Sequence, residues 1–328
     1  MTEPAASRVV AVLVFPGVQL LDAAGPLQVF ATANDYARAA GETPPYRPRL
    51  IAPQAGNVAS SAGVTLMAAG LPRGAAQRAI DTVLVAGGPG IDALARDATV
   101  LAWLRRSAGT ARRVVSVCTG AFLLAEAGLL DRRRATTHWR RAAELAERYP
   151  AVAVDADAIH VRDGTIWSSA GVTAGIDLAL ALVEEDLGPA AALAVARHLV
   201  VFNRRAGGQS QFSAAAPLPP AAAPFADLHD WMARNLSRPL TLPSLAQQAG
   251  MSERSFLRHY RAATGLSPAR MVERMRVEAA RRALAESRAP VKAIARRCGF
   301  GSEETMRRSF LRQIAVPPLA YRQRFGTV

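Results

Sequence analysis

The 328-residue sequence has few of the residues that build disulfide frameworks or metal clusters. Its two cysteines, Cys118 and Cys298, lie far apart, and its five histidines are scattered. A disulfide framework is therefore excluded, which agrees with a reducing compartment, and no metal-ligand cluster is visible. We expect the protein to use neither a metal ion nor a cofactor.

Long apolar runs and targeting signals are also missing. No run approaches the roughly 20 residues of a membrane-spanning helix. The first ten residues, MTEPAASRVV, lack the basic and then apolar plan of a signal peptide. We therefore expect a cytoplasmic protein with no membrane partner. Half of the residues are apolar, and the chain is long enough for two domains with cores of their own.

Lysine is nearly absent, since Lys292 is the single lysine and the other basic residues are arginine, a bias that reflects a GC-rich genome. The charge is uneven along the chain. Residues 225–328 contain 19 basic and 8 acidic residues, which is +11 of the total net charge of +14. This asymmetry indicates a module that binds a polyanion. A solvated basic surface would look the same, and charge alone does not decide between the two.

Strand and helix patterns alternate in the N-terminal part. Short, β-branched, continuously apolar runs predict strands at residues 8–15, 82–87 and 113–117. Helical patterns cover residues 20–35, 100–109, 173–186 and 189–203, and a hairpin turns at Asp163-Gly164. This order predicts an α/β sandwich with a parallel sheet.

The Ala/Pro tract SAAAPLPPAAAP, residues 213–224, has no amphipathic period and predicts a linker. It divides the chain into a first domain of residues 1–212 and an all-α second domain of residues 225–328.

The second domain contains an internal repeat. AQQAGMSERSFLRHYRAATGLSP aligns with ARRCGFGSEETMRRSFLRQIAVPP, so that Ser252 corresponds to Ser302. Each copy has a short helix, a glycine turn, a serine in N-cap position and a second helix rich in arginine, which is the plan of a helix-turn-helix unit.

The second helix of each copy has an apolar face and an outward polar face. Phe256 and Tyr260 face the core in the first copy. We expect the outward residues to meet DNA; they are Arg254, Leu257 and Arg258 in the first copy and Glu303, Glu304, Thr305, Arg307 and Arg308 in the second. Arginine can grip guanine and glutamate can accept from cytosine. Any one of these arginines can instead hold a phosphate or lie in solvent.

On these residues the second domain resembles the AraC-type DNA-binding domain. The resemblance covers both units and implies two recognition helices that enter adjacent major grooves of double-stranded DNA. One departure is Ala315, where the family often has glycine.

Cys118 lies between the strand-like run RVVSV and an apolar helix pattern. At the start of a helix the dipole and the backbone N–H groups lower the pKa of a thiol, which predicts a reactive cysteine. A buried, inert cysteine in a tight turn would give the same pattern.

Residues 8–205 resemble the PfpI/ThiJ superfamily in FPGVQLLDAAGPLQVF, AGGPGID, VSVCTGAFLLAEAGLL, RRATTHW and VRDGTIWSSAGVTAGIDLAL. The resemblance implies the fold of class I glutamine amidotransferases, a flavodoxin-like parallel sheet, and among the enzymes of the superfamily it is to isonitrile hydratase. It makes Cys118 the nucleophile, Asp22 a nearby carboxylate, Thr119 a backbone donor, Gly88 part of an oxyanion-binding turn and His138 a histidine near the thiol. Asp22 can also be only a helix N-terminal charge, and His138 a packed structural histidine.

The two parts together resemble the GlxA family of transcriptional regulators. This resemblance extends to the GGQSQF segment, residues 207–212, expected to close the first domain. It implies a DNA-binding regulator that forms a homodimer and senses a small-molecule effector, with Cys118 in the ligand pocket. Because one chain already contains two helix-turn-helix units, it could also bind DNA as a monomer. Two alternatives remain: a cysteine-dependent hydratase or amidase with an attached DNA-binding domain, and a redox sensor that acts through Cys118.

Overall fold

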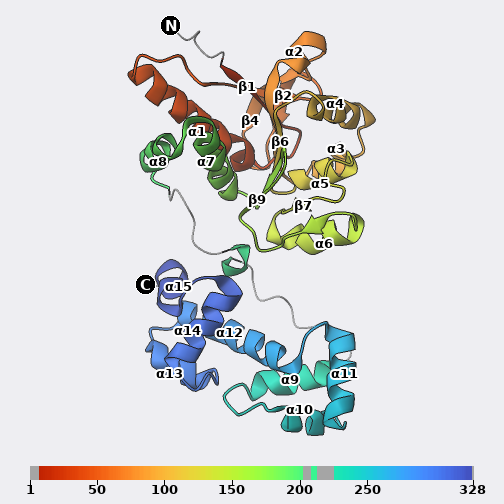
Figure 1. Ribbon diagram of the computed structural model, residues 1–328, viewed down its shortest axis with the longest axis vertical. Coiled ribbons are helices and arrows are strands. Elements are labelled where there is room, and N and C mark those ends of the chain that lie inside the picture. The colour runs from red at the N-terminus through yellow and green to blue at the C-terminus, as the bar shows by residue number, and fades with distance from the viewer. Residues whose placement is uncertain (1–6, 202–207, 213–224, 327–328) are drawn as a thin grey trace. The chain divides into compact units, whose positions relative to one another are not determined.

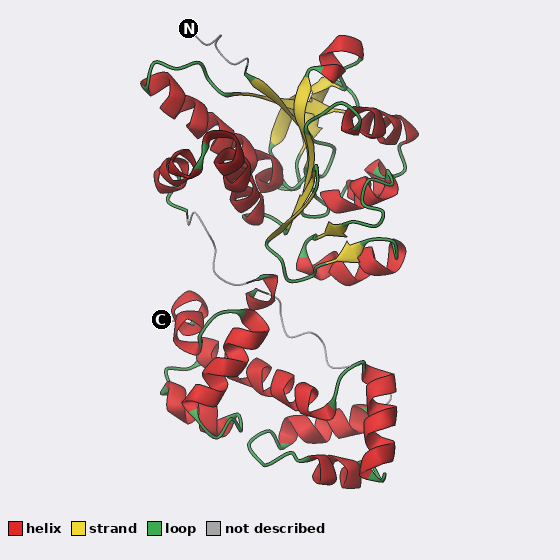
Figure 2. Cartoon of the chain, in the orientation of Figure 1, coloured by secondary structure: helices red, strands yellow, loops and turns green. Residues whose placement is uncertain are grey.

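The computed structural model describes residues 7–201, 208–212 and 225–326. Internal contacts divide the chain into two compact units, Met1–Arg205 and Ala206–Val328. The first unit is an α/β sandwich and the second is helical, as the sequence predicts (Figures 1 and 2).

The first unit is built on an eight-stranded sheet with the order β3-β4-β2-β1-β5-β6-β10-β9. The strands are β1 (Arg8–Leu13), β2 (Tyr46–Ala52), β3 (Gly56–Ala59), β4 (Thr65–Gly70), β5 (Ile80–Val85), β6 (Arg113–Val117), β9 (His160–Asp163) and β10 (Ile166–Ser169). All neighbours from β4 to β10 pair in parallel, and only the outermost strands β3 and β9 run antiparallel. Two further strands, β7 (Arg134–Ala135) and β8 (Ala153–Val154), form a separate parallel pair.

Helices cover both faces of this sheet. They are α1 (Leu20–Ala39), α2 (Gly74–Arg78), α3 (Ile91–Leu94), α4 (Ala98–Ala108), α5 (Gly120–Glu126), α6 (Ala142–Arg148), α7 (Ala174–Leu187) and α8 (Pro189–His198). Helices α1, α7 and α8 pack together on one face, and α3, α4 and α5 lie on the other (Figure 1). The central strands β1, β5 and β6 are thereby buried on both sides, which explains their continuously apolar sequences.

A buried ion pair fastens the end of α7 to the start of β6. The Arg113 guanidinium donates to Asp186, with Nη2 and Oδ2 2.5 Å apart, and both side chains are almost fully buried. The Tyr46 hydroxyl also donates to Asp186, at 2.9 Å, and Arg112 reaches it from the surface at 2.7 Å. Because a buried charge needs partners in several directions, this network fixes the end of α7 against the amino ends of β2 and β6.

The second unit consists of two helical subdomains. Its helices are α9 (Ala226–Arg234), α10 (Leu242–Gln248), α11 (Glu253–Thr264), α12 (Pro268–Glu286), α13 (Val291–Arg297), α14 (Glu303–Ile314) and α15 (Pro318–Phe325). One apolar core joins α9, α10, α11 and the first half of α12, and a second joins the rest of α12 with α13, α14 and α15. Helix α12 therefore belongs to both cores.

The boundary between the units differs from the one expected from the sequence. Residues 208–212 were expected to close the first domain, but they pack on the second unit instead. The Ser210 hydroxyl donates to the carbonyl of Gln313 at 3.2 Å, and the Phe212 ring meets Phe325 edge to face. The predicted end of the first domain at residue 212 is therefore wrong, since these contacts draw the segment to α14 and α15. The predicted linker at residues 213–224 lies outside the described residues.

Among the residues that the structure describes, no helix is both long enough and apolar enough to cross a membrane.

Candidate functional site

Cys118 lies at the elbow between β6 and α5, as the sequence predicts. Its backbone has a φ of 57°, in the left-handed region that non-glycine residues rarely adopt. Three hydrogen bonds hold it there: its N–H donates to the carbonyls of Ser169 and Ala170, and its own carbonyl accepts from the Thr137 hydroxyl. The elbow is therefore strained and firmly supported.

The Asp22 carboxyl group lies beside this elbow, fully buried at the start of α1. Its Oδ1 accepts from the N–H of Val172 at 2.9 Å, its Oδ2 from the N–H of Gly87 at 3.1 Å, and the Cys118 thiol is hydrogen-bonded to it. Val172 is itself left-handed, with a φ of 58°, which is a clear outlier for a β-branched residue. Two strained residues thus hold one buried carboxyl group.

Burial raises the pKa of Asp22 to about 6, although the hydrogen bonds from Val172, Cys118 and Gly87 oppose the change. The carboxyl group therefore titrates close to neutral pH.

The thiol does not have the lowered pKa expected from its place before a helix. Burial is the largest effect and raises the pKa of Cys118 well above its ordinary value, and the negative charge of Asp22 raises it further. Hydrogen bonds from Thr119 oppose this only in part. Burial, with only 7% of the side chain exposed, and the Asp22 carboxyl group therefore both oppose the lowered thiol pKa that the sequence predicts.

Gly88, which follows β5, and Thr119, which precedes α5, lie next to the thiol. The N–H of Gly88 donates to the Thr119 hydroxyl at 2.9 Å, so it is already engaged. The Thr119 N–H lies near the sulfur. The Thr119 amide, expected to be a backbone donor, thus lies beside the sulfur, whereas the N–H of Gly88, expected to belong to an oxyanion-binding turn, is directed to the Thr119 side chain.

His138 reaches the same place from the loop after β7. A Cβ atom at Gly171 would lie 2.4 Å from His138 Cδ2 and 2.8 Å from Cys118 Sγ. Only glycine therefore lets the backbone pass between the imidazole and the thiol. The His138 ring stacks on Trp139, and its Nδ1 accepts from the N–H of Arg140. Burial, aided by Arg140, lowers the pKa of His138, so the ring is neutral at pH 7.

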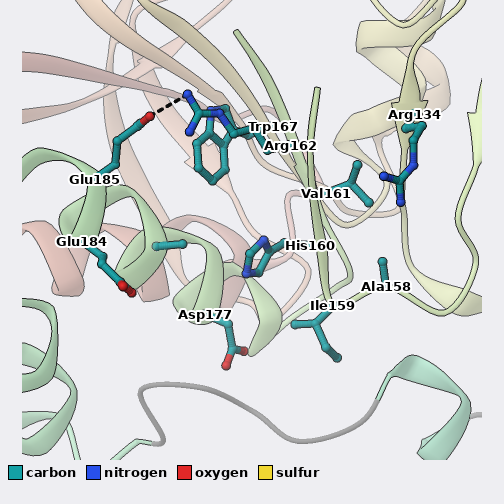
Figure 3. A pocket seen from close by; sticks show the side chains of 11 residues that line it. Arg134, Ala158, Ile159, His160, Val161, Arg162, Trp167, Asp177, Glu184 and Glu185 are labelled. Carbon is teal, nitrogen blue, oxygen red and sulfur yellow. Dashed lines mark ion pairs between the residues drawn. The ribbon is translucent and has the colours of Figure 1, made fainter. Parts of the chain in front are cut away.

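A hollow in the first unit, away from Cys118, was not predicted. It has a volume of about 750 Å³ and lies between β9, β10 and α7 (Figure 3). Arg162 lies over the Trp167 ring and pairs with Glu185 at 2.7 Å, while His160 and Asp177 form another part of the wall. No local sequence pattern indicates this hollow, because the fold alone brings its residues together.

In the second unit, α10 and α11 form the first helix-turn-helix. Ser252 caps α11, and Phe256 and Tyr260 are fully buried. Arg254, Leu257 and Arg258 are exposed, as expected. They line a surface hollow of about 610 Å³ together with Leu242, Glu253, Arg261 and Ser267. Arg261 was missed, although its spacing of three residues from Arg258 places it on the same helix face.

Helices α13 and α14 form the second unit of the repeat. Ser302 caps α14, and Met306 and Phe310 fill the core. The exposed residues are Glu303, Glu304, Arg307 and Arg308. Thr305 differs from the expectation, since it is half-buried and its hydroxyl lies 2.8 Å from that of Ser302. It supports the start of the helix rather than projecting outward.

Paired helix-turn-helix units with outward arginines make the second unit a DNA-binding module. The protein is thus a DNA-binding transcriptional regulator that also carries an α/β domain.

Comparison with known proteins agrees with this class. Residues 8–185 match the DJ-1/PfpI family, and residues 245–324 match a helix-turn-helix domain. The chain therefore belongs to the DJ-1/PfpI family and, through its second unit, to the HTH-type transcriptional regulators.

Three relatives illustrate the match. HTH-type transcriptional regulator Rv1931c of Mycobacterium tuberculosis is 34% identical over 75% of this chain and 96% of its own length. HTH-type transcriptional regulator GlxA of Rhizobium meliloti is 31% identical over 92% of this chain and 93% of its own length. Isonitrile hydratase of Pseudomonas putida is 38% identical over 54% of this chain and 71% of its own length. The predicted resemblance to the GlxA regulators is confirmed.

Proposed function

We propose that the α/β domain senses a small, polar, nitrogen-containing metabolite at the Cys118 elbow and that this binding controls the DNA-binding unit. One observation carries the proposal: the buried Asp22 carboxyl group is hydrogen-bonded to a thiol and to the strained residue Val172. Burying a carboxyl group and straining two residues both cost stability. Proteins keep such arrangements mainly at sites that bind or react.

The groups around the sulfur suit a small ligand with both donors and acceptors. Asp22 can accept or, when protonated, donate, and the neutral His138 ring, whose Nδ1 accepts from Arg140, can donate from Nε2. The His138 and Trp139 rings are stacked and only half-buried, so part of their surface can contact the portion of the ligand that lies outside the elbow. The small exposed fraction of Cys118 limits contact with the sulfur to a few atoms.

A cysteine-dependent hydratase is the second candidate, and the identity with isonitrile hydratase favours it. Nucleophilic attack requires the thiolate, whereas burial and the charge of Asp22 favour the protonated thiol. The Gly88 N–H, the expected oxyanion donor, is engaged by Thr119. The raised thiol pKa also opposes the redox-sensor alternative, because peroxides react with thiolates. We therefore favour binding over both.

We infer further that the protein acts in the cytoplasm, where the chromosome of a bacterium lies, and binds its operators as a homodimer. The bacterial relatives with this architecture support the first inference. Sedimentation velocity with and without operator DNA tests the second, for which we expect two chains for each operator.

The decisive experiment maps where a tagged copy binds across its genome and then measures affinity for the best sites at fixed salt. We expect sharp peaks upstream of a few operons. The substrates of the enzymes encoded there are then added as candidate effectors. At least one should change the affinity of the wild type by about 10-fold, within the usual range of coupling between sites.

Matched variants locate the effector. We expect Cys118→Ala and His138→Ala to bind operators normally but to lose the response to the effector. Arg162→Ala, an exposed residue that lines the hollow between β9 and α7, serves as the control and should keep the response. The opposite pattern, loss in Arg162→Ala alone, would place the effector in that hollow. Turnover of an added isonitrile that Cys118→Ala abolishes would instead establish the enzyme.

A further inference from the structure

The two recognition helices, α11 and α14, differ at equivalent positions. The alignment of Ser252 with Ser302 places Glu304 where α11 has Arg254, and Arg307 where α11 has Leu257. The first helix therefore presents an arginine and a leucine where the second presents a glutamate and an arginine.

On α14 these two side chains form a two-point contact. Arg307 Nε donates to Glu304 Oε2 at 2.7 Å, and Nη2 donates to Oε1 at 2.9 Å. The side chains are 49% and 56% exposed, and an exposed pair three residues apart adds little to fold stability. Arg308 is a weaker neighbour, with its Nε 3.8 Å from the same carboxylate. The contact therefore mainly fixes the orientation of one guanidinium.

The contact leaves the other edge of that guanidinium open. A guanidinium has five N–H bonds, of which Glu304 accepts two. Nη1 and the second hydrogen of Nη2 form another pair of parallel donors, and these have no partner within the described part of the chain. Guanine presents N7 and O6 in the major groove at the spacing that such a fork matches. Arg307 can therefore hold Glu304 and a guanine at the same time.

The charges on α14 indicate that this helix contributes more to the choice of DNA sequence than to electrostatic attraction to DNA. Its outward face carries Arg307 and Arg308 against Glu303 and Glu304, while Arg312 is tied to Glu273 on α12. The outward face of α11 carries Arg254, Arg258 and Arg261 against Glu253 alone. A carboxylate on a surface that meets phosphates weakens binding to any DNA. A carboxylate that weakens binding to all DNA in this way can still improve discrimination between sequences.

We propose that Glu304 is a positioning residue that holds Arg307 with its free edge toward the major groove, where Arg307 reads a guanine. The Glu304–Arg307 pair then determines the sequence preference of the second helix-turn-helix, while α11 supplies most of the electrostatic attraction. This inference rests on DNA binding by the second unit and is independent of the effector proposed above.

The test uses the full-length protein and a library of randomised DNA duplexes, from which wild type and variants each select their preferred sites. Competition titrations at fixed salt then measure the affinity for the preferred site and for unrelated DNA. The variants are Glu304→Gln, Arg307→Ala and the double substitution. Glu303→Gln is the matched control, since it removes the same charge from the same helix turn.

We expect Arg307→Ala and Glu304→Gln to relax the preference at one and the same G·C pair, by about 10-fold for Arg307→Ala and by a smaller factor for Glu304→Gln. The double substitution should lose no more preference than Arg307→Ala alone, because both residues act on one contact. Glu304→Gln should also raise the affinity for unrelated DNA by about 2- to 5-fold. Glu303→Gln should raise affinity for all DNA and leave the preference unchanged.

Three results would overturn the proposal. Glu304→Gln could behave like Glu303→Gln, which would make Glu304 an ordinary surface charge. It could relax a different base pair from Arg307→Ala, with additive losses, which would mean that Glu304 reads a base itself. The wild type could select no G·C pair that depends on Arg307. Thermal unfolding of each variant confirms that these exposed substitutions leave the fold intact.

Discussion

His229 Nε2 and Tyr260 Oη lie 2.6 Å apart in the core that joins α9 to α11. Both side chains are fully buried, and the other ring nitrogen of His229 has no partner among the described residues. The apolar surroundings favour a neutral imidazole. This hydrogen bond is therefore a polar contact that holds the first recognition helix against α9.

The His229 contact predicts loss of stability in acid. Burial lowers the pKa of His229 below its ordinary value, although Asp230 opposes this. The unfolded chain consequently takes up a proton first, so the stability contributed by the neutral ring is present above about pH 6.5 and is lost as the pH falls. We expect the thermal midpoint of the full chain to fall between about pH 7 and pH 5. His229→Gln, which does not titrate, should show a smaller fall; an equal fall would assign the effect to other groups.

Ala315 and Gly265 provide a reciprocal prediction about helix ends. Both residues end a recognition helix in the left-handed conformation, with φ values of 53° and 70°. This conformation costs an alanine about 1 kcal/mol more than a glycine. Ala315→Gly should therefore stabilise the protein by about 1 kcal/mol and Gly265→Ala should destabilise it by about the same amount. A Cβ at Gly265 meets no atom within 4 Å, so no clash complicates the comparison. Denaturant titration measures both, and equal signs would refute the argument.

Asp22 predicts a second pH dependence, with the opposite sign from His229. Its folded-state pKa of about 6 lies above its ordinary value of 3.8. The folded protein thus binds the proton more tightly, and it loses stability as the pH rises through this interval. Asp22→Asn removes this loss. The free energy of unfolding of the variant, relative to wild type, should rise by about 2 kcal/mol from pH 4 to pH 7. A difference independent of pH would show that folding does not raise the pKa of Asp22.

Arg258 predicts how the first recognition helix binds. Arg258→Ala should lower the affinity for the preferred operator by about 1–3 kcal/mol if the residue reads a base, with relaxed preference at one base pair. A uniform loss on all DNA, with a salt dependence weaker by about one charge, would make it a phosphate contact. Arg38→Ala, on α1 of the first unit, removes the same charge and should leave DNA binding unchanged.

Much of this architecture could be predicted because its signals are local. The strand predicted at residues 113–117 matches β6, and the repeat around Ser252 and Ser302 located both recognition helices. The strand β2 was missed, since its exposed arginines interrupt the apolar run that marks a buried strand. Residues 208–212 were misplaced because their contacts come from a distant part of the chain.

The pKa of the Cys118 thiol could not be predicted from local sequence patterns. The sequence places Cys118 before a helix, which on its own lowers a thiol pKa. The outcome depends on burial and on Asp22, which lies 96 positions earlier in the chain. The fixation of Arg307 by Glu304 was equally hidden, although a spacing of three residues on a helix permits it.

Helix α12 sets a length scale for the DNA that this protein can occupy. Met271, Val272 and Met275 are packed into the first core, and Ala280 and Leu284 into the second, so neither reading head can rotate without the other. A helix of 19 residues is about 28 Å long. Each base pair added between two half-sites rotates one half-site by about 34° around the duplex axis relative to the other. Occupied operators must consequently share a single phase between their half-sites, and half a turn of added DNA leaves one head facing the wrong side of the duplex.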